Sequence, residues 1–188
     1  NAYCEMPWVQ ALQDVQAANP ALGRCCAVWY ARESKYLVYR PDGTSTLITS
    51  SCGWEQGDPL SPAGYSIGSL RALRAARIRI QVLVGPEAAA DVLIMAYLDD
   101  VLLGVPRHCF AAALRILREE LAAIRHFPAP HKTEIWAPSG NRPPGLRPED
   151  EAAWRPEGLN VLGLPLPPPE QQPPLDPDPH GAEVQLRH

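Results

Sequence analysis

The stretch VLIMAYLDDVLLGV, residues 92–105, decides how this sequence is expected to fold. The runs Val92–Leu98 and Val101–Val105 are short, apolar and rich in β-branched residues, which favours strands. Only Asp99 and Asp100 separate them, and so short a connection joins two strands as a tight antiparallel hairpin. The pattern therefore predicts a β-hairpin that carries two carboxylates at its tip.

Two adjacent carboxylates between apolar strands have two interpretations. Within a strand, neighbouring side chains point to opposite faces, so either Asp99 or Asp100 would enter the core, where an unpaired charge is costly. At a hairpin tip both can instead converge on a divalent cation, and hard oxygen ligands suit Mg²⁺. The alternative is an ordinary polar turn, because aspartate favours turns. The pair by itself favours the ordinary turn over a metal site.

The segment QGDPLSP, residues 56–62, is a second candidate functional feature. Asp58 followed by Pro59 predicts a helix start, with an acidic N-cap and proline at the first helical position. We expect this helix to run to about Ala75. Backbone N–H groups at such a helix entrance can meet a phosphate or a base. The alternative is a plain junction between a loop and a helix.

The rest of the first 137 residues predicts a mixed unit of helices and strands. Helices are expected over residues 7–18 and 20–31, and the first of them would place Met6, Val9, Leu12 and Val15 on one side. Strands over 36–40 and 46–51 would flank a turn at 41–43, and residues 78–84 are also strand-like. A further helix is expected over 107–126, because apolar residues recur there at helical spacing. They are Phe110, Leu114, Leu117, Leu121 and Ile124.

Proline separates the chain into regions of different character. Of the 22 prolines, 13 lie at or after Pro138, where they oppose both helices and central strands. The composition predicts a first domain over residues 1–137 and a proline-rich linker over 138–158. The apolar residues within 159–166 predict one short strand, and 167–188 are expected to be a disordered tail.

Composition and charge set loose bounds on function. The net charge of −4 opposes nucleic-acid binding if the chain is taken whole. Residues 21–80, however, carry 8 Arg and Lys against 4 Asp and Glu, while residues 139–188 carry 4 against 8. The five cysteines are odd in number and form no CxxC pair, which favours free thiols in a reducing compartment. No apolar run approaches the roughly 20 residues of a membrane span. We therefore expect an intracellular protein of the nucleus or cytoplasm that is not secreted.

QGDPLSP at 56–62, followed by AYLDD at 96–100, resembles the reverse transcriptase family, in particular its non-LTR (LINE-like) retrotransposon type. Three further segments resemble that family in the same order along the chain: ITSSCG at 48–53, PHKTE at 130–134 and LG at 162–163. The triplet Asn1-Ala2-Tyr3 resembles one that follows a catalytic aspartate in the family. That aspartate would lie three residues before Asn1.

The resemblance implies an RNA-directed DNA polymerase, a nucleotidyltransferase, of α+β fold. Its palm-like antiparallel sheet would have packed helices and partial fingers. Asp99 and Asp100 would be catalytic and would bind two Mg²⁺ ions, for which Mn²⁺ is an alternative. The residues that would contact the nucleotide or the template are Tyr3, Gln56, Gly57, Asp58, Ser61, Tyr97 and Lys132. Among these, Tyr3 would exclude ribonucleotides, and Lys132 would neutralise the triphosphate or give a proton to pyrophosphate.

The implied partners are an RNA template, a DNA primer and deoxynucleoside triphosphates, with no membrane. Because the first catalytic aspartate would lie upstream of Asn1, this fragment alone is expected to be inactive. One alternative is another palm polymerase, such as a viral RNA-dependent RNA polymerase, but those usually carry Gly-Asp-Asp, which Ala96–Asp100 does not fit. The other is a non-catalytic retroelement relic, or a captured domain that binds nucleic acid or protein.

Overall fold

The computed structural model describes residues 5–55 and 57–166, and the chain divides into two compact units. The first unit ends at Ala129 and the second begins at Pro130, earlier than the predicted domain boundary at residue 137. Each unit is described by itself. Helices and strands are mixed, and the described strands form three two-stranded antiparallel sheets. None of the helices in the described ranges is both long and apolar enough to span a membrane.

Two short helices open the first unit, as the sequence predicts. Helix α2 spans Trp8–Ala18 and helix α3 spans Pro20–Tyr30. Asn19 separates them and caps α3, because its side-chain oxygen accepts hydrogen bonds from the backbone N–H groups of residues 21 and 22. The predicted apolar side of α2 is wrong in one position. Val9 is 74% exposed, and Trp8 takes its place in the core.

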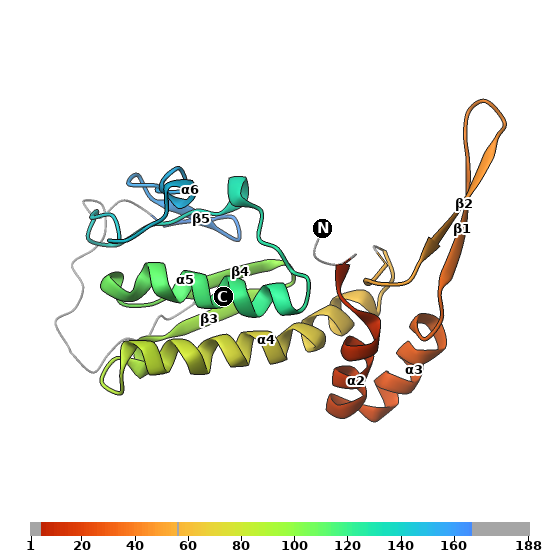
Figure 1. Cartoon of the computed structure of the whole chain (residues 1–188), viewed down its shortest axis with the longest axis horizontal. Coiled ribbons are helices and arrows are strands. Elements are labelled where there is room, and N and C mark those ends of the chain that lie inside the picture. Colours follow the sequence, from red (N-terminus) through yellow and green to blue (C-terminus); the bar gives the residue numbers. More distant parts are fainter. Residues whose placement is uncertain (1–4, 56, 167–188) are drawn as a thin grey trace. The chain divides into compact units, whose positions relative to one another are not determined.

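A β-hairpin follows and projects away from these helices (Figure 1). Strand β1, Ser34–Tyr39, pairs with strand β2, Ser45–Ser50, and the turn between them contains the expected Pro41, Asp42 and Gly43. The Asp42 carboxylate accepts hydrogen bonds from the N–H and the hydroxyl of Thr44, which close the turn and lower the pKa of Asp42. Apolar side chains on both faces of this hairpin are exposed.

Helix α4, Ser61–Val84, is the longest element, and it corrects two predictions. The helix does not end at Ala75, and residues 78–84 form its last turns instead of a strand. Buried residues recur at helical spacing along its whole length; they are Ser61, Tyr65, Ser69, Ala72, Ala76 and Ile80. The β-branched composition of 78–84 suggested a strand, but only Ile80 of Ile78, Ile80 and Val82 is buried, as one face of a helix requires. The N-cap is Leu60 rather than Asp58.

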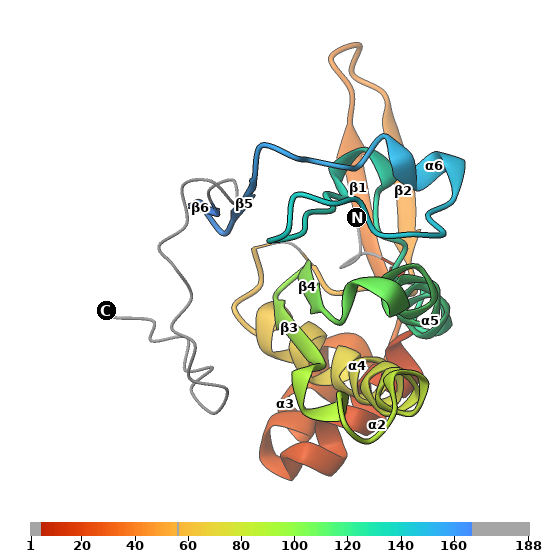
Figure 2. The same ribbon diagram turned by 90° about the vertical axis from the view of Figure 1, so that its left-hand side faces the viewer.

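The predicted hairpin at the centre of the sequence is confirmed. Strand β3, Leu93–Tyr97, pairs antiparallel with strand β4, Asp100–Gly104, after a short 3₁₀ helix, η1, Ala89–Asp91. Figures 1 and 2 show this hairpin along one side of the paired helices α4 and α5. The partly buried side chains that pack it against the core are Ile94, Val101, Leu103 and Val105.

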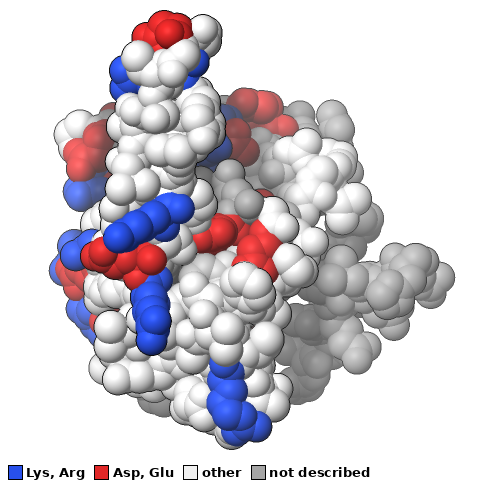
Figure 3. Space-filling view, turned by 90° about the vertical axis from the view of Figure 1, so that its right-hand side faces the viewer, with Lys and Arg blue, Asp and Glu red and all other residues white. Residues whose placement is uncertain are grey.

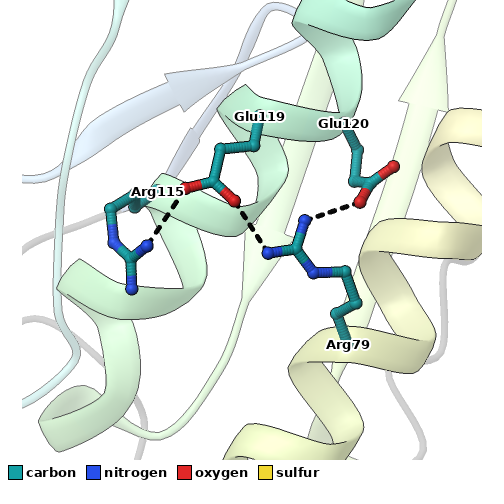
Figure 4. A network of polar contacts seen from close by, with 4 residues as sticks. All are labelled: Arg79, Arg115, Glu119 and Glu120. Carbon is teal, nitrogen blue, oxygen red and sulfur yellow. Dashed lines mark hydrogen bonds and ion pairs between the residues drawn. The ribbon is translucent and has the colours of Figure 1, made fainter.

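Helix α5, Phe110–Ala123, is the predicted amphipathic helix, and a 3₁₀ helix, η2, Arg107–Cys109, precedes it. Its apolar stripe packs into the core as expected. Leu114, Leu117, Leu121 and Ile124 are buried, and Phe110 is half-buried. On the outer side, Arg79 of α4 forms ion pairs with Glu119 at 2.7 Å and Glu120 at 2.6 Å (Figure 4). These exposed contacts join α4 to α5 over the apolar seam.

The second unit is built from short elements. A 3₁₀ helix, η3, Pro130–Lys132, leads to a β-bridge between Ile135 and Trp154. The predicted linker contains helix α6, Pro148–Glu151, and a buried Ala153. Residues 159–166, expected as one strand, form a small hairpin of β5, Leu159–Val161, and β6, Leu164–Leu166. The predicted tail, residues 167–188, lies outside the described residues.

Candidate functional site

The β3–β4 turn places the two aspartates in different positions. Tyr97 pairs with Asp100, so the two-residue turn consists of Leu98 and Asp99. The predicted tip of Asp99 and Asp100 is therefore shifted by one residue, and Asp100 begins β4. Leu98 has a φ of 55°, a left-handed conformation that costs a non-glycine residue roughly 1–2 kcal/mol. The packing of both strands thus holds a strained turn in which Asp99 is presented.

Neither carboxylate enters the core. Residues paired across the hairpin share a face, so Asp100 lies on the same face as Tyr97 and Met95, which are 64% and 44% exposed. The opposite face carries Val101 and Leu103 toward the helices. Asp99 and Asp100 are both exposed, and no described residue donates a hydrogen bond to either carboxylate or forms an ion pair with it. Their oxygens are therefore open to a ligand from solvent.

Two buried polar side chains, Tyr65 and His126, contact each other in the core, and the charge of Asp99 influences the pKa of His126. The hydroxyl of Tyr65 lies 2.7 Å from Nδ1 of His126, and these side chains are 0% and 5% exposed. Burial lowers the pKa of His126 below its ordinary value, and the negative charge of Asp99 acts in the opposite direction. His126 carries no distinctive signal in the sequence, because it is a single histidine near the end of an amphipathic pattern without a characteristic spacing to other polar residues.

The loop before α4 is held by hydrogen bonds from its own residues and from α3. The carboxylate of Asp58 accepts from the hydroxyl of Tyr30 and, through Oδ1, from the backbone N–H of Leu60 at 2.8 Å. The hydroxyl of Ser61 donates to the carbonyl of Glu55 at 2.6 Å. Gly57 has a φ of 91° in this loop, a conformation that favours glycine. Asp58 therefore organises the turn ahead of the helix, where an N-cap role was expected.

Two tryptophan side chains, Trp8 and Trp54, pack beneath the loop before α4. The indole N–H of Trp8 donates to the carbonyl of Gly53, whose own N–H donates to the carbonyl of Met6 at 2.8 Å. The ring of Trp54 packs directly on the backbone of α4 at Gly64, where any added Cβ would overlap the ring. Because Trp54 is 1% exposed, the start of the loop is part of the hydrophobic core.

The predicted site residues differ in how accessible they are. Gly57 and Tyr97 are exposed, whereas Ser61 is 2% exposed and its hydroxyl is engaged inside the protein. Lys132 is exposed and belongs to the second unit. Tyr3 and Gln56 lie outside the described residues. The structure thus brings Gly57, Asp58 and Ser61 together at the entrance of α4, and Asp99 and Asp100 together where the β3–β4 turn meets β4.

Charge on the face that carries the β1–β2 hairpin is mixed. In Figure 3, Lys and Arg side chains alternate with groups of Asp and Glu on this face, and both signs occur at the tip of the hairpin. On this visible, described face the positive charges therefore do not form one broad basic surface.

Within the described ranges, no three or more His, Cys, Asp or Glu side chains are grouped for a metal ion, so Asp99 and Asp100 stand as a pair. Comparisons of the chain with protein-family models, with curated proteins and with solved structures find no significant match.

Proposed function

We propose that this chain is part of an RNA-directed DNA polymerase of the non-LTR retrotransposon type, and that the Asp99–Asp100 turn binds its catalytic metal ions. One observation carries the proposal. A strained two-residue turn, at the end of an apolar hairpin, presents two exposed carboxylates without described protein partners. The order of the motifs QGDPLSP and AYLDD along the sequence supports it. In this account β3, β4, α4 and α5 belong to a polymerase palm.

The turn suits Mg²⁺ as a ligand set. Both aspartates supply hard carboxylate oxygens, and both are exposed, so binding requires no rearrangement of buried charge. Bound metal ions would lower the pKa of a primer 3′-hydroxyl and neutralise charge on the leaving pyrophosphate. Asp99, inside the turn, is proposed as the direct ligand, and Asp100 as its support. Mn²⁺, another oxygen-binding divalent ion, would occupy the same place.

The remaining residues position the substrates. Gly57 and the turn of Asp58 lie at the entrance of α4 and are proposed to contact the template strand together with Gln56. Ser61 acts on the shape of the turn, because its buried hydroxyl bonds to the backbone of Glu55. Tyr97 offers an exposed ring beside Asp100 to the nucleotide. Tyr3 and Lys132 keep the roles that the resemblance implies, at the sugar and at the triphosphate.

Two carboxylates from one turn do not complete a two-metal site. The family pattern places a third, from an aspartate three residues before Asn1. We therefore expect the 188-residue chain alone to be inactive, although the longer protein would extend a primer by attack of its 3′-hydroxyl on a deoxynucleoside triphosphate.

Primer extension tests this proposal. An RNA template is annealed to a labelled DNA primer and supplied with Mg²⁺ and deoxynucleotides. This mixture is incubated with the 188-residue chain and, separately, with a longer chain that also contains the residues encoded upstream of Asn1. The longer chain should extend the primer, and the Asp99→Asn variant of it should not; Asp91→Asn, another exposed aspartate, is the matched control. Extension by the 188-residue chain would refute the need for the upstream aspartate. A stop codon or another residue at that upstream position would favour the non-catalytic relic.

A further inference from the structure

Tyr30 is the last residue of α3, and its ring lies deep in the core of the first unit. It is 1% exposed and contacts two indoles, with ring centroids 5.9 Å from Trp8 and 4.7 Å from Trp54. These contacts leave the ring little freedom. The hydroxyl at its end is therefore held in a fixed position.

That hydroxyl meets the loop before α4 at two places. It donates a hydrogen bond to Oδ2 of Asp58, and it lies 3.2 Å from the hydroxyl of Ser61. The other carboxylate oxygen of Asp58 accepts from the backbone N–H of Leu60, while Ser61 donates to the carbonyl of Glu55. One phenol thus contacts two residues of the Gly57–Ser61 turn, Asp58 and Ser61.

The phenol of Tyr30 is a hydrogen-bond donor at every physiological pH, because it keeps its proton. Burial and, after it, the hydrogen bond to Asp58 together raise the pKa of Tyr30 to about 12, so the phenol stays protonated throughout the physiological range. A hydrogen bond to an ionised carboxylate is stronger than one between neutral groups. Loss of the hydroxyl would leave Oδ2 of Asp58 against an apolar ring without that donor.

We propose that Tyr30 is a positioning residue that fixes the Gly57–Ser61 turn through its hydrogen bond to Asp58 and its contact with Ser61, so that the turn meets an RNA template in one prepared conformation. The template in this statement rests on the proposed function. Tyr30 itself touches no substrate. Trp8 and Trp54 fill the same core, but the hydroxyl of Tyr30 is the group that connects this core to the carboxylate of Asp58.

The variant Tyr30→Phe removes the hydroxyl and keeps the ring. The matched control is Tyr65→Phe, which removes the hydroxyl of another fully buried tyrosine, one that lies within hydrogen-bonding distance of His126. Two readouts are taken on the 188-residue chain. Amide hydrogen exchange reports on the backbone N–H groups of Asp58, Leu60 and Ser61. Fluorescence anisotropy reports on binding of a labelled DNA primer annealed to an RNA template with a single-stranded overhang.

In Tyr30→Phe, the hydrogens of these three amides should exchange about tenfold faster, and the affinity for the hybrid should fall about tenfold. Both changes have the size expected for loss of one charge-assisted hydrogen bond. Tyr65→Phe should change neither. Unchanged exchange in Tyr30→Phe, relative to amides of α5, would overturn the proposal. So would faster exchange with unchanged hybrid binding, because the turn would then not position the template. Absence of hybrid binding by the unsubstituted chain would instead refute the proposed function, and the exchange data would still decide whether Tyr30 fixes the turn.

Discussion

The hydroxyl of Tyr65 lies 2.7 Å from Nδ1 of His126, in a core that excludes both side chains from solvent. This bond joins the N-terminal part of α4 to the segment just after α5. Nδ1 of a neutral imidazole accepts the Tyr65 proton in one tautomer and donates to the Tyr65 oxygen in the other, while an imidazolium can only donate. Burial of the ring, rather than this hydrogen bond, therefore favours a neutral His126.

The first prediction concerns pH. The folded state lowers the pKa of His126, so the unfolded chain binds more protons once the pH falls below about 6.5, the ordinary value for histidine. Stability is therefore fully present above that pH and is lost as the pH falls further. His126→Asn keeps an acceptor near the Nδ1 position and does not titrate. Urea unfolding at pH 7.5 and pH 5.5 should show a smaller pH-dependent loss for His126→Asn than for the unsubstituted chain; equal losses would contradict the assignment.

The second prediction concerns the close contact between Trp54 and α4. A methyl group at position 64 would overlap the Trp54 ring, so Gly64→Ala should destabilise the chain by about 1–3 kcal/mol, although alanine is the better helix former. Ser66→Ala, on the exposed side of the same helix, is the control and should be nearly neutral. Thermal unfolding measures both. A Gly64→Ala chain as stable as the control would show that the indole is free to move.

The exposed ion pairs between α4 and α5 give a third prediction. Arg79 contacts Glu119 and Glu120, and these hydrogen bonds raise the pKa of Arg79 and lower that of Glu119. Because all three groups face solvent, Arg79→Ala should lower the melting temperature only slightly, and the difference should shrink as salt screens the charges. The control is Arg77→Ala, which removes another exposed arginine of α4, two residues before Arg79. A large decrease in melting temperature that does not depend on salt would mean that the aliphatic part of Arg79 stabilises the protein by packing.

Local patterns in the sequence predict much of the first unit correctly. Several predicted features are each determined by neighbours in the chain, and all of them appear in the structure: the apolar strands on either side of Asp99 and Asp100, the turn at Gly43, the break at Asn19 and the stripe from Phe110 to Ile124. The β-branched run 78–84 was misread because β propensity is weak against a long helix whose other turns already pack in the core.

The parts of the candidate site that the sequence could not show depend on long-range contacts. Asp58 was expected as a helix cap, but Tyr30, far away along the chain, supplies the donor that draws its carboxylate into a turn. The burial of Ser61 and the bond between Tyr65 and His126 likewise arise only when α3, α4 and α5 come together. The one-residue shift of the β3–β4 turn follows from strand register, which short apolar runs do not specify alone.

The central claim, that the Asp99–Asp100 turn binds divalent metal, is tested most directly by paramagnetic broadening of amide signals with substoichiometric Mn²⁺. In the 188-residue chain the amides of residues 98–101 should broaden first, Mg²⁺ should reverse the effect, and Asp99→Asn should abolish it while Asp91→Asn leaves it unchanged. Broadening that appears equally at the exposed carboxylate of Glu119, or that survives Asp99→Asn, would contradict the assignment of the turn as a metal site.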